Sequence, residues 1–292
     1  MKVLNYCAGY DTGGYSIRLK QAFDRHSTFP YRSCIGRPAS YIRYPTDAPH
    51  REARHLQQWA DIIHVSHQPL PVTKPQVVQY HGTKFRNNPD KFLTLQKQAG
   101  AVAVCSTIDL ELLAPDDLVW LPTPYDLDWL ATFRKPGGGP VRVGHAPTAR
   151  KIKSTDVFLD AMTELGSEAE LVLIERQPWT TCLELKGTCD VYYDQTILGY
   201  GNNAVEAWGM GIPVIAGAQP DTLAAMRHRF GGDLPFYETS EDMILEALVA
   251  MMDSGTRQYY AQAGSRHAKQ WHDAAKVVAQ AETIYKNVLG SD

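Results

Sequence analysis

The sequence lacks several features that would assign the protein to a class at once. Its 292 residues hold five cysteines, an odd number, with no C-x-x-C pair and no histidine pair to complete a zinc site. We therefore expect reduced thiols and no structural metal. The start of the chain has no apolar stretch like that of a secretory signal, and no window approaches the ~20 apolar residues of a membrane span. We expect a cytoplasmic protein without integral membrane contact.

The chain also has no large excess of either charge. A formal net charge of −3 and a pI near 6.4 exclude the broad positive surface that nucleic acids and anionic membranes attract. Apolar residues make up 44% and charged residues 21%, which is ordinary for a globular protein with a sizeable core. A chain of this length favours two domains of about 100–150 residues each.

Short β-branched runs closed by polar or glycine residues recur along the chain and predict buried parallel strands. They are KVLNYCA, ADIIHVSH, QVVQYHGT, AVAVCST, VRVGHAP, ELVLIE, DVYYDQ and IPVIAG. Helix candidates lie between them, among them SIRLKQAFDRH, HREARHLQQWA, PDKFLTLQKQAG and STDVFLDAMTELG, the last with Ser154 or Thr155 as its N-cap. The alternation predicts an α/β fold of two Rossmann-like parallel-sheet domains facing a cleft.

The segment FRKPGGGP at residues 133–140 has the composition of a linker, so we place the domain boundary there. The N-terminal domain is then 1–133 and the C-terminal domain 140–271, followed by the end of a long helix that begins at about residue 257. Ligands of parallel sheets bind beyond the carboxyl ends of the strands. The polar residues and glycines at these ends are Gly13, Gly14, Ser66, His67, His81, Gly82, Ser106, residues 145–153, Glu175, Arg176 and residues 199–206.

Two of these segments carry groups suited to a phosphate-bearing ligand. In HAPTARKIKST, Arg150, Lys151 and Lys153 lie within four positions after a strand and could hold a diphosphate. In LGYGNNAVEAW, glycines allow close backbone approach, the helix start offers N–H groups to an anion, and Glu206 could accept bonds from sugar hydroxyls. A solvated basic loop and a plain turn before a surface helix remain the alternatives.

HAPTARKIKST, ELVLIE and DVYYDQTILGYGNNAVEAWGMGIPVIAG together resemble the nucleotide-sugar-binding domain of retaining GT-B glycosyltransferases of family 4. GG at 13–14, ADIIHVS, VVQYHGT, AVAVCST and LPTPYD follow in the order seen in those enzymes, so the resemblance covers nearly the whole chain. It implies a hexosyl or other glycosyl transferase (EC 2.4) that moves a sugar from a nucleotide sugar, a UDP-sugar first and GDP-mannose second, without a cofactor or a bound metal. It also implies that the helix at about 272–292 packs back on the first domain, which faces the acceptor.

The resemblance also assigns roles to particular residues. Arg150 and Lys153 bind the donor diphosphate, Glu206 binds the ribose, Gly14 lets the first turn approach the donor, and His81 contacts the transferred sugar. The candidate catalytic residues are therefore His81, Arg150 and Lys153. The candidate donor-binding residues are Gly13, Gly14, His145, Arg150, Lys153, Glu175, Tyr200, Gly201, Asn202 and Glu206.

One position departs from the family pattern. Members carry a glutamate eight positions before the ribose-binding one, and here that position is Leu198. Either Asp194 or Gln195 compensates for it, or the sugar is held differently. This supports one alternative, a degenerate nucleotide-sugar-binding protein, and a UDP-sugar epimerase of similar fold is a separate third possibility.

The acceptor side is less well defined. His64 and His67 are candidates for acceptor contact or for structural roles, and Trp179 could stack on the base or pack in the core. The acceptor itself, a sugar, a protein or DNA, and the oligomeric state are not indicated by the sequence.

Overall fold

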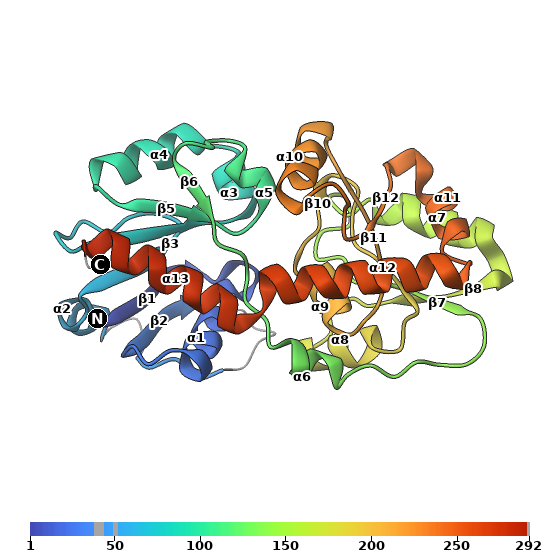
Figure 1. Ribbon diagram of the computed structural model, residues 1–292, viewed down its shortest axis with the longest axis horizontal. Helices are drawn as coiled ribbons and strands as arrows, with labels where there is room; N and C mark the ends of the chain where they lie inside the picture. Colours follow the sequence, from blue (N-terminus) through green and yellow to red (C-terminus); the bar gives the residue numbers. More distant parts are fainter. Residues whose placement is uncertain (38–43, 49–51, 291–292) are drawn as a thin grey trace. The chain divides into compact units, whose positions relative to one another are not determined.

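The computed structural model describes residues 1–37, 44–48 and 52–290, and the chain forms two compact units (Figure 1). The first unit comprises Met1–Tyr125 and His272–Asp292, and the second comprises Asp126–Trp271. Each unit has its own sheet and its own hydrophobic core. Part of the helix predicted over HREARHLQQWA lies outside the described residues.

The division between the units differs from the predicted boundary at 133–140, because that segment is bound into the second unit. Helix α6 (Leu127–Ala131) packs on α9 (Asn202–Gly209). The Lys135 N–H donates to the carbonyl of Gly187 (2.9 Å), and the Arg134 guanidinium donates to the carbonyls of Gly187 (3.0 Å) and Cys189 (2.6 Å). Composition typical of a linker does not reveal such backbone anchoring.

The first unit is built on a parallel sheet of strand order β2-β1-β3-β4-β5-β6. Its strands are β1 (Val3–Tyr10), β2 (Tyr31–Arg37), β3 (Ile62–Ser66), β4 (Gln76–Tyr80), β5 (Val102–Cys105) and β6 (Leu118–Trp120). Every residue of β3 and β4 is buried, including polar residues such as His64 and Gln79 beside the β-branched ones. The parallel strands predicted in this half are confirmed.

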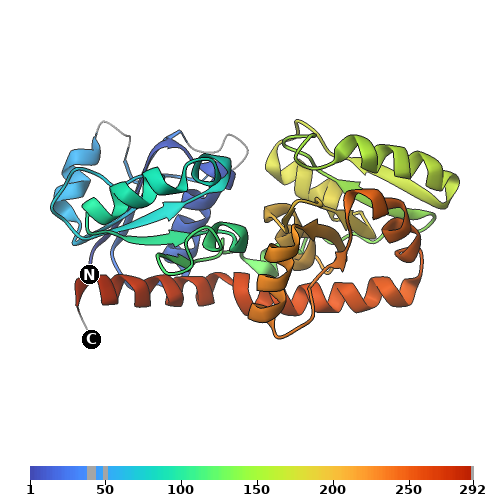
Figure 2. The ribbon, with the colours of Figure 1, turned by 90° about the horizontal axis from the view of Figure 1, so that it is seen from above.

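Helices cover this sheet and complete its core. They are α1 (Tyr15–His26), α2 (Ala53–Trp59), α3 (Gly82–Arg86), α4 (Pro89–Gln98), α5 (Ile108–Glu111) and α13 (Ala274–Leu289). Helix α4 is followed by Gly100 at φ +59°, the left-handed conformation expected of a C-terminal glycine. Helix α13, red in Figure 2, runs along the first unit. It packs on α1 and β4, and its residues Ala274, Val277, Val278, Ala281 and Tyr285 belong to the core of the unit.

The second unit has a sheet of strand order β10-β11-β9-β7-β8, with β12 also paired to β11. Its strands are β7 (Val141–His145), β8 (Ala169–Leu173), β9 (Val191–Tyr193), β10 (Leu198–Gly199), β11 (Val214–Ala218) and β12 (Tyr237–Glu238). All pairs are parallel except β10 with β11, where Leu198 pairs with Ala218. Leu198, the residue that departs from the family pattern, is therefore part of the sheet.

The helices of this unit are α6, α7 (Thr155–Leu165), α8 (Trp179–Lys186), α9, α10 (Pro220–Phe230), α11 (Ile244–Ala250) and α12 (Ser254–His267). Helices α7 and α11 pack together over the core. Ser154 is the N-cap residue of α7, but its hydroxyl bonds to that of Thr196 (3.0 Å) instead of capping the helix. The predicted single C-terminal helix is wrong: a π-helical turn at Ala268–His272 separates α12 from α13, and the Asp273 carboxylate caps α13.

Candidate functional site

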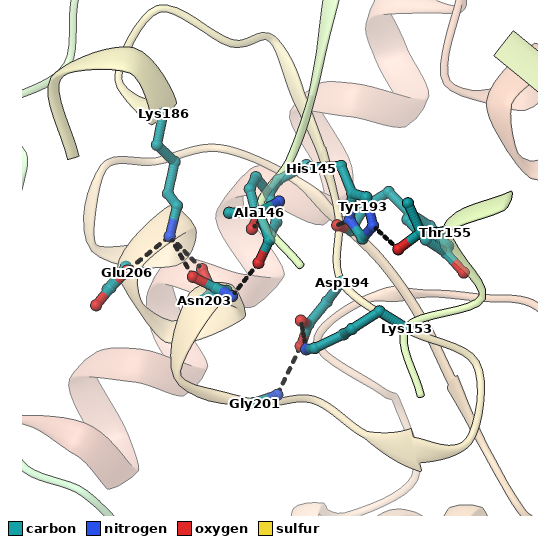
Figure 3. Close-up of polar contacts among 11 residues, drawn as sticks. His145, Ala146, Lys153, Thr155, Lys186, Tyr193, Asp194, Gly201, Asn203 and Glu206 are labelled. Carbon is teal, nitrogen blue, oxygen red and sulfur yellow. Dashed lines mark hydrogen bonds and ion pairs between the residues drawn. The ribbon is translucent and has the colours of Figure 1, made fainter. Parts of the chain in front are cut away.

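The polar residues that follow β7 and β9 in the second unit meet at one carboxylate (Figure 3). The side chain of Asp194, directly after β9, accepts a bond from the Lys153 ammonium through one oxygen and from the Gly201 N–H (2.6 Å) through the other. The Asp194 side chain is 1% exposed and that of Lys153 is 12% exposed. An ammonium and the N–H that opens α9 therefore already hold an anionic group at this edge of the sheet.

Two glycines precede α9, and the backbone of the first requires glycine. Gly199 has φ +83°, and a side chain there would overlap the end of Met226. A Cβ on Gly201 would lie 3.5 Å from an Asp194 oxygen and 3.7 Å from the Lys153 nitrogen. The glycine turn thus brings the start of α9 against the cation, as the sequence motif suggests.

The carboxylate of Glu206 is buried within a second polar cluster. It accepts a bond from the Lys186 ammonium (2.6 Å) through one oxygen and from the Trp179 indole N–H (2.8 Å) through the other. Lys186 also donates to the Asn203 side-chain oxygen (3.0 Å), and the Asn203 amide donates to the Ala146 carbonyl (3.0 Å). The cluster ties α8 and α9 to the end of β7 (Figure 3), and Glu206 is only 3% exposed.

Sequence reasoning does not find Lys186. The side chain is fully buried, and its ammonium lies 4.8 Å from the centre of the Tyr192 ring. A lysine near the end of a short helix usually lies at the surface. The structure explains the buried lysine, because the buried carboxylate of Glu206 on α9 needs a cation beside it.

Arg150 lies in the exposed part of the basic loop. Its guanidinium makes two bonds of 2.8 Å to the Glu175 carboxylate, and a 3.6 Å contact to Asp156. The side chain is 46% exposed and that of Glu175 is 32% exposed. Bonds from Arg150 lower the pKa of Glu175. An exposed pair of this kind is weak, so either partner can be redirected to a ligand.

Two of the predicted donor-binding residues, His145 and Tyr200, make hydrogen bonds within the protein. The buried His145 donates from Nδ1 to the Tyr193 carbonyl (3.0 Å) and accepts at Nε2 from the Thr155 hydroxyl (2.8 Å), so neither ring nitrogen is available to a donor in this arrangement. Burial lowers the pKa of His145 to about 4. The ring of Tyr200 is buried, and its hydroxyl bonds to His267 Nε2 (2.9 Å).

The remaining predicted groups of this unit have mixed surroundings. Asn202 opens α9 and is half-buried. Trp179, a candidate for base stacking, lies with its ring 5.3 Å from that of Trp129 in addition to its bond with Glu206. Gln195, a candidate to replace the missing glutamate, is buried, with its amide nitrogen 3.9 Å from the Cβ position of Gly201.

In the first unit, the glycine turn after β1 is closed by an internal carboxylate. Gly13 and Gly14 have φ of +63° and +68°, values that favour glycine. The buried Asp11 carboxylate accepts from the N–H groups of Ser16 (2.8 Å) and Ile17 (3.2 Å), which caps α1. The start of α1 is therefore less open to a ligand anion than the glycine pair alone indicates.

Of the three predicted histidines of this unit, His64 lies in the middle of β3, His67 directly follows β3 and His81 directly follows β4. His64 is buried and bonds through Nδ1 to the Tyr285 hydroxyl (2.6 Å), which favours its structural role. His67 has φ +76° and bonds through Nε2 to the carbonyl of Tyr10 (3.0 Å). The ring of His81 is 5.7 Å from that of His67.

Two of these three, His64 and His81, have a buried Nε2 without a hydrogen-bond partner among the described residues, and of these two His81 directly follows a strand. It is 5% exposed, its Nδ1 lies 3.3 Å from the Ser106 hydroxyl, and its Nε2 has no hydrogen-bond partner among the described residues. Burial lowers its pKa well below the usual value, so the ring is neutral at pH 7. A buried, neutral imidazole with one unsatisfied nitrogen can donate to or accept from a ligand.

Within residues 1–37, 44–48 and 52–290, no histidine, cysteine, aspartate and glutamate side chains are grouped so as to hold a metal ion. In the same ranges every helix is too short or too polar to traverse a bilayer.

Comparison with known proteins shows the fold. No protein-family model matches the chain, and neither does any curated protein. A solved glycosyltransferase from Rickettsia africae is similar over 100% of this chain and 99% of its own, with a TM-score of 0.73 and 11% identity. HepE from Anabaena, solved in complex with UDP and glucose, is similar over 98% of this chain and 99% of its own, with a TM-score of 0.69 and 13% identity.

A putative UDP-N-acetylglucosamine 2-epimerase from Listeria monocytogenes is also similar, over 100% of this chain and 97% of its own, with a TM-score of 0.60 and 14% identity. The two sheets and their surrounding helices are those of the GT-B fold, so the predicted fold class is confirmed. At such low identity the likeness concerns the fold, and function must be argued from the site.

Proposed function

We propose that the protein is a glycosyltransferase that moves a sugar from a UDP-sugar to an acceptor hydroxyl, with retention of the anomeric configuration and without a bound metal. The observation that carries this proposal is the convergence of the Lys153 ammonium and the Gly201 N–H on one anionic group beyond β7 and β9. Donors arranged around an anion at the edge of a parallel sheet are suited to a diphosphate.

The roles follow from the accessibility of each group. Arg150, which is half-exposed, and Lys153 bind the diphosphate and stabilise the charge that develops on it as the bond to the sugar breaks. Glu206 accepts bonds from the ribose hydroxyls, and the Trp179 indole, which now occupies one of its oxygens, moves aside for them. Lys186 orients this carboxylate and balances its charge.

The donor site is tested by replacing Arg150 with alanine. We expect the dissociation constant for UDP, measured by calorimetry, to rise at least about tenfold, because bonds between charged groups contribute about 1.5–3 kcal/mol. The matched control is Arg227→Ala: Arg227 is 44% exposed, belongs to the same unit and pairs with Glu238. Equal UDP affinity in the two variants would remove Arg150 from the site.

The role of His81 is tested by His81→Asn. We expect turnover of the donor to fall about 100-fold while the dissociation constant for UDP changes less than threefold, because the imidazole acts on the reacting sugar and not on the nucleotide. His26→Asn, at the exposed end of α1, is the control. A near-normal rate in His81→Asn, with the fold verified by circular dichroism, contradicts the assignment.

A second candidate function follows from the epimerase of similar fold. Incubation with a panel of labelled nucleotide sugars separates the possibilities. A transferase releases UDP and slowly hydrolyses one donor when no acceptor is present, whereas an epimerase interconverts two UDP-sugars and releases no UDP. Tight binding without turnover identifies the third possibility, a nucleotide-sugar-binding protein.

A further inference from the structure

The Lys153–Asp194 pair differs from the other ion pair beside the basic loop in its burial. Arg150 and Glu175 are 46% and 32% exposed, so solvent screens their charges. Lys153 and Asp194 are 12% and 1% exposed, and both oxygens of Asp194 are bonded. Inside the protein the charge of Asp194 therefore acts on Lys153 with little screening.

The Asp194 carboxylate cannot move away from Lys153 and Gly201 and still have hydrogen-bond partners. It is almost completely enclosed, and leaving Lys153 and Gly201 would bury an uncompensated charge. Lys153 is the more accessible partner, and its ammonium has two further N–H groups. An arriving phosphate must therefore share the Lys153 ammonium with Asp194.

We propose that Asp194 sets the affinity of this site for diphosphates: it neutralises Lys153, holds the binding of nucleoside diphosphates down and thereby favours release of the UDP product. The proposal rests on the proposed function, because it assigns Lys153 to the phosphate subsite. Two effects of removing the charge oppose each other. A freed Lys153 loses some orientation, which weakens binding, but its ammonium no longer shares its N–H groups with a carboxylate and can give them all to the phosphates, and this gain is larger.

The experiment measures UDP and inorganic pyrophosphate binding by calorimetry in four forms: wild type, Asp194→Asn, Lys153→Met and the double variant. Asp194→Asn keeps the side-chain size and an oxygen for the Gly201 N–H. We expect it to bind UDP and pyrophosphate at least about tenfold more tightly than the wild type. In the Lys153→Met background the same substitution changes affinity less than threefold, because the ammonium that the carboxylate neutralises is gone.

Two further variants serve as controls. Glu175→Gln removes the exposed carboxylate from Arg150, and we expect it to tighten UDP binding less than threefold. Glu238→Gln, on the Arg227 pair of the same unit, leaves UDP affinity unchanged. A gain in Asp194→Asn as small as that in Glu238→Gln, or a loss of affinity, overturns the inference.

A measurement on the wild type keeps the inference testable if Asp194→Asn does not fold. Nuclear magnetic resonance of the wild-type protein should show the Lys153 ammonium signal shifting with UDP while the Gly201 amide keeps its bonded position. An unshifted Lys153 signal at saturating UDP overturns the inference but leaves nucleotide binding intact. Failure of the wild type to bind any nucleoside diphosphate instead overturns the proposed function, and the inference falls with it.

Discussion

Replacement of Lys186 by methionine is expected to lower the free energy of unfolding of the second unit by about 3–5 kcal/mol. Methionine fills most of the space of the lysine side chain, so the loss comes from charge and hydrogen bonding rather than from a cavity. The Glu206 carboxylate, with a side chain 4% exposed, would lose the ammonium 2.6 Å away, and the Asn203 side-chain oxygen would lose its donor. An uncompensated buried carboxylate is far more costly than a broken surface pair.

The measurement is urea unfolding followed by circular dichroism, with the slope of the transition checked for each variant. Arg227→Met breaks an exposed pair in the same unit and should cost less than about 1 kcal/mol. The double variant Lys186→Met/Glu206→Gln removes both charges and should recover most of the loss. If the double variant is as unstable as Lys186→Met, the charge of Glu206 is not the cause.

The same cluster limits what variants of Glu206 reveal about donor binding. The resemblance to family 4 enzymes leads to the expectation that Glu206→Ala weakens donor binding. That substitution also leaves the fully buried Lys186 without its anion. Weaker donor binding could then result from a disturbed packing of α8 and α9 and not from a lost contact with the ribose. Arg150→Ala avoids this difficulty because its partner Glu175 is partly solvated. The exposed arginine is therefore the better probe of the same site.

The fold could be predicted because its signals are local. β-Branched runs such as residues 62–66 and 76–80 are buried on both faces, and their sequences show it directly. The backbone has a positive φ at Gly14 and at Gly199, and a glycine in the sequence is a local sign of such a conformation. The boundary at 133–140 was beyond this reasoning, because the bonds that hold Lys135 to Gly187 join residues far apart in the sequence.

The candidate site could be predicted less completely for the same physical reason. The loop with Arg150 and Lys153 and the turn at Gly201 were found from residue type and position after a strand. Whether each charged group faces solvent or an internal partner depends on the opposite element, as Glu206 and Lys186 illustrate. Asp194 was noticed only as a replacement for the glutamate missing at Leu198, whereas the structure makes it the partner of Lys153.

Lowering the pH from 7 to about 5 is expected to unfold the protein, because four buried histidines are kept neutral by the fold. Burial lowers the pKa of His64, His145 and His272 to about 4, and that of His81 well below its usual value. In the unfolded chain these residues have a pKa of about 6.5. Below pH 6.5 the unfolded state therefore binds protons that the folded state does not, so stability decreases as the pH falls and the decrease ends near pH 4.

Each such histidine contributes at most about 1.4 kcal/mol per pH unit, so the three with a pKa of about 4 contribute about 4 kcal/mol per unit between pH 6 and 5, and His81 adds to this decrease. This is a large part of a typical total stability of about 5–15 kcal/mol. Urea unfolding from pH 7.5 to 5 measures this slope. His272→Gln, which can still donate to the Thr123 carbonyl 2.9 Å from Nδ1, should flatten it by about 1.4 kcal/mol per unit. His26→Gln, at an exposed position, should leave the slope unchanged. A stability that is constant over this range would show that the buried histidines take up protons in the folded protein as readily as in the unfolded chain.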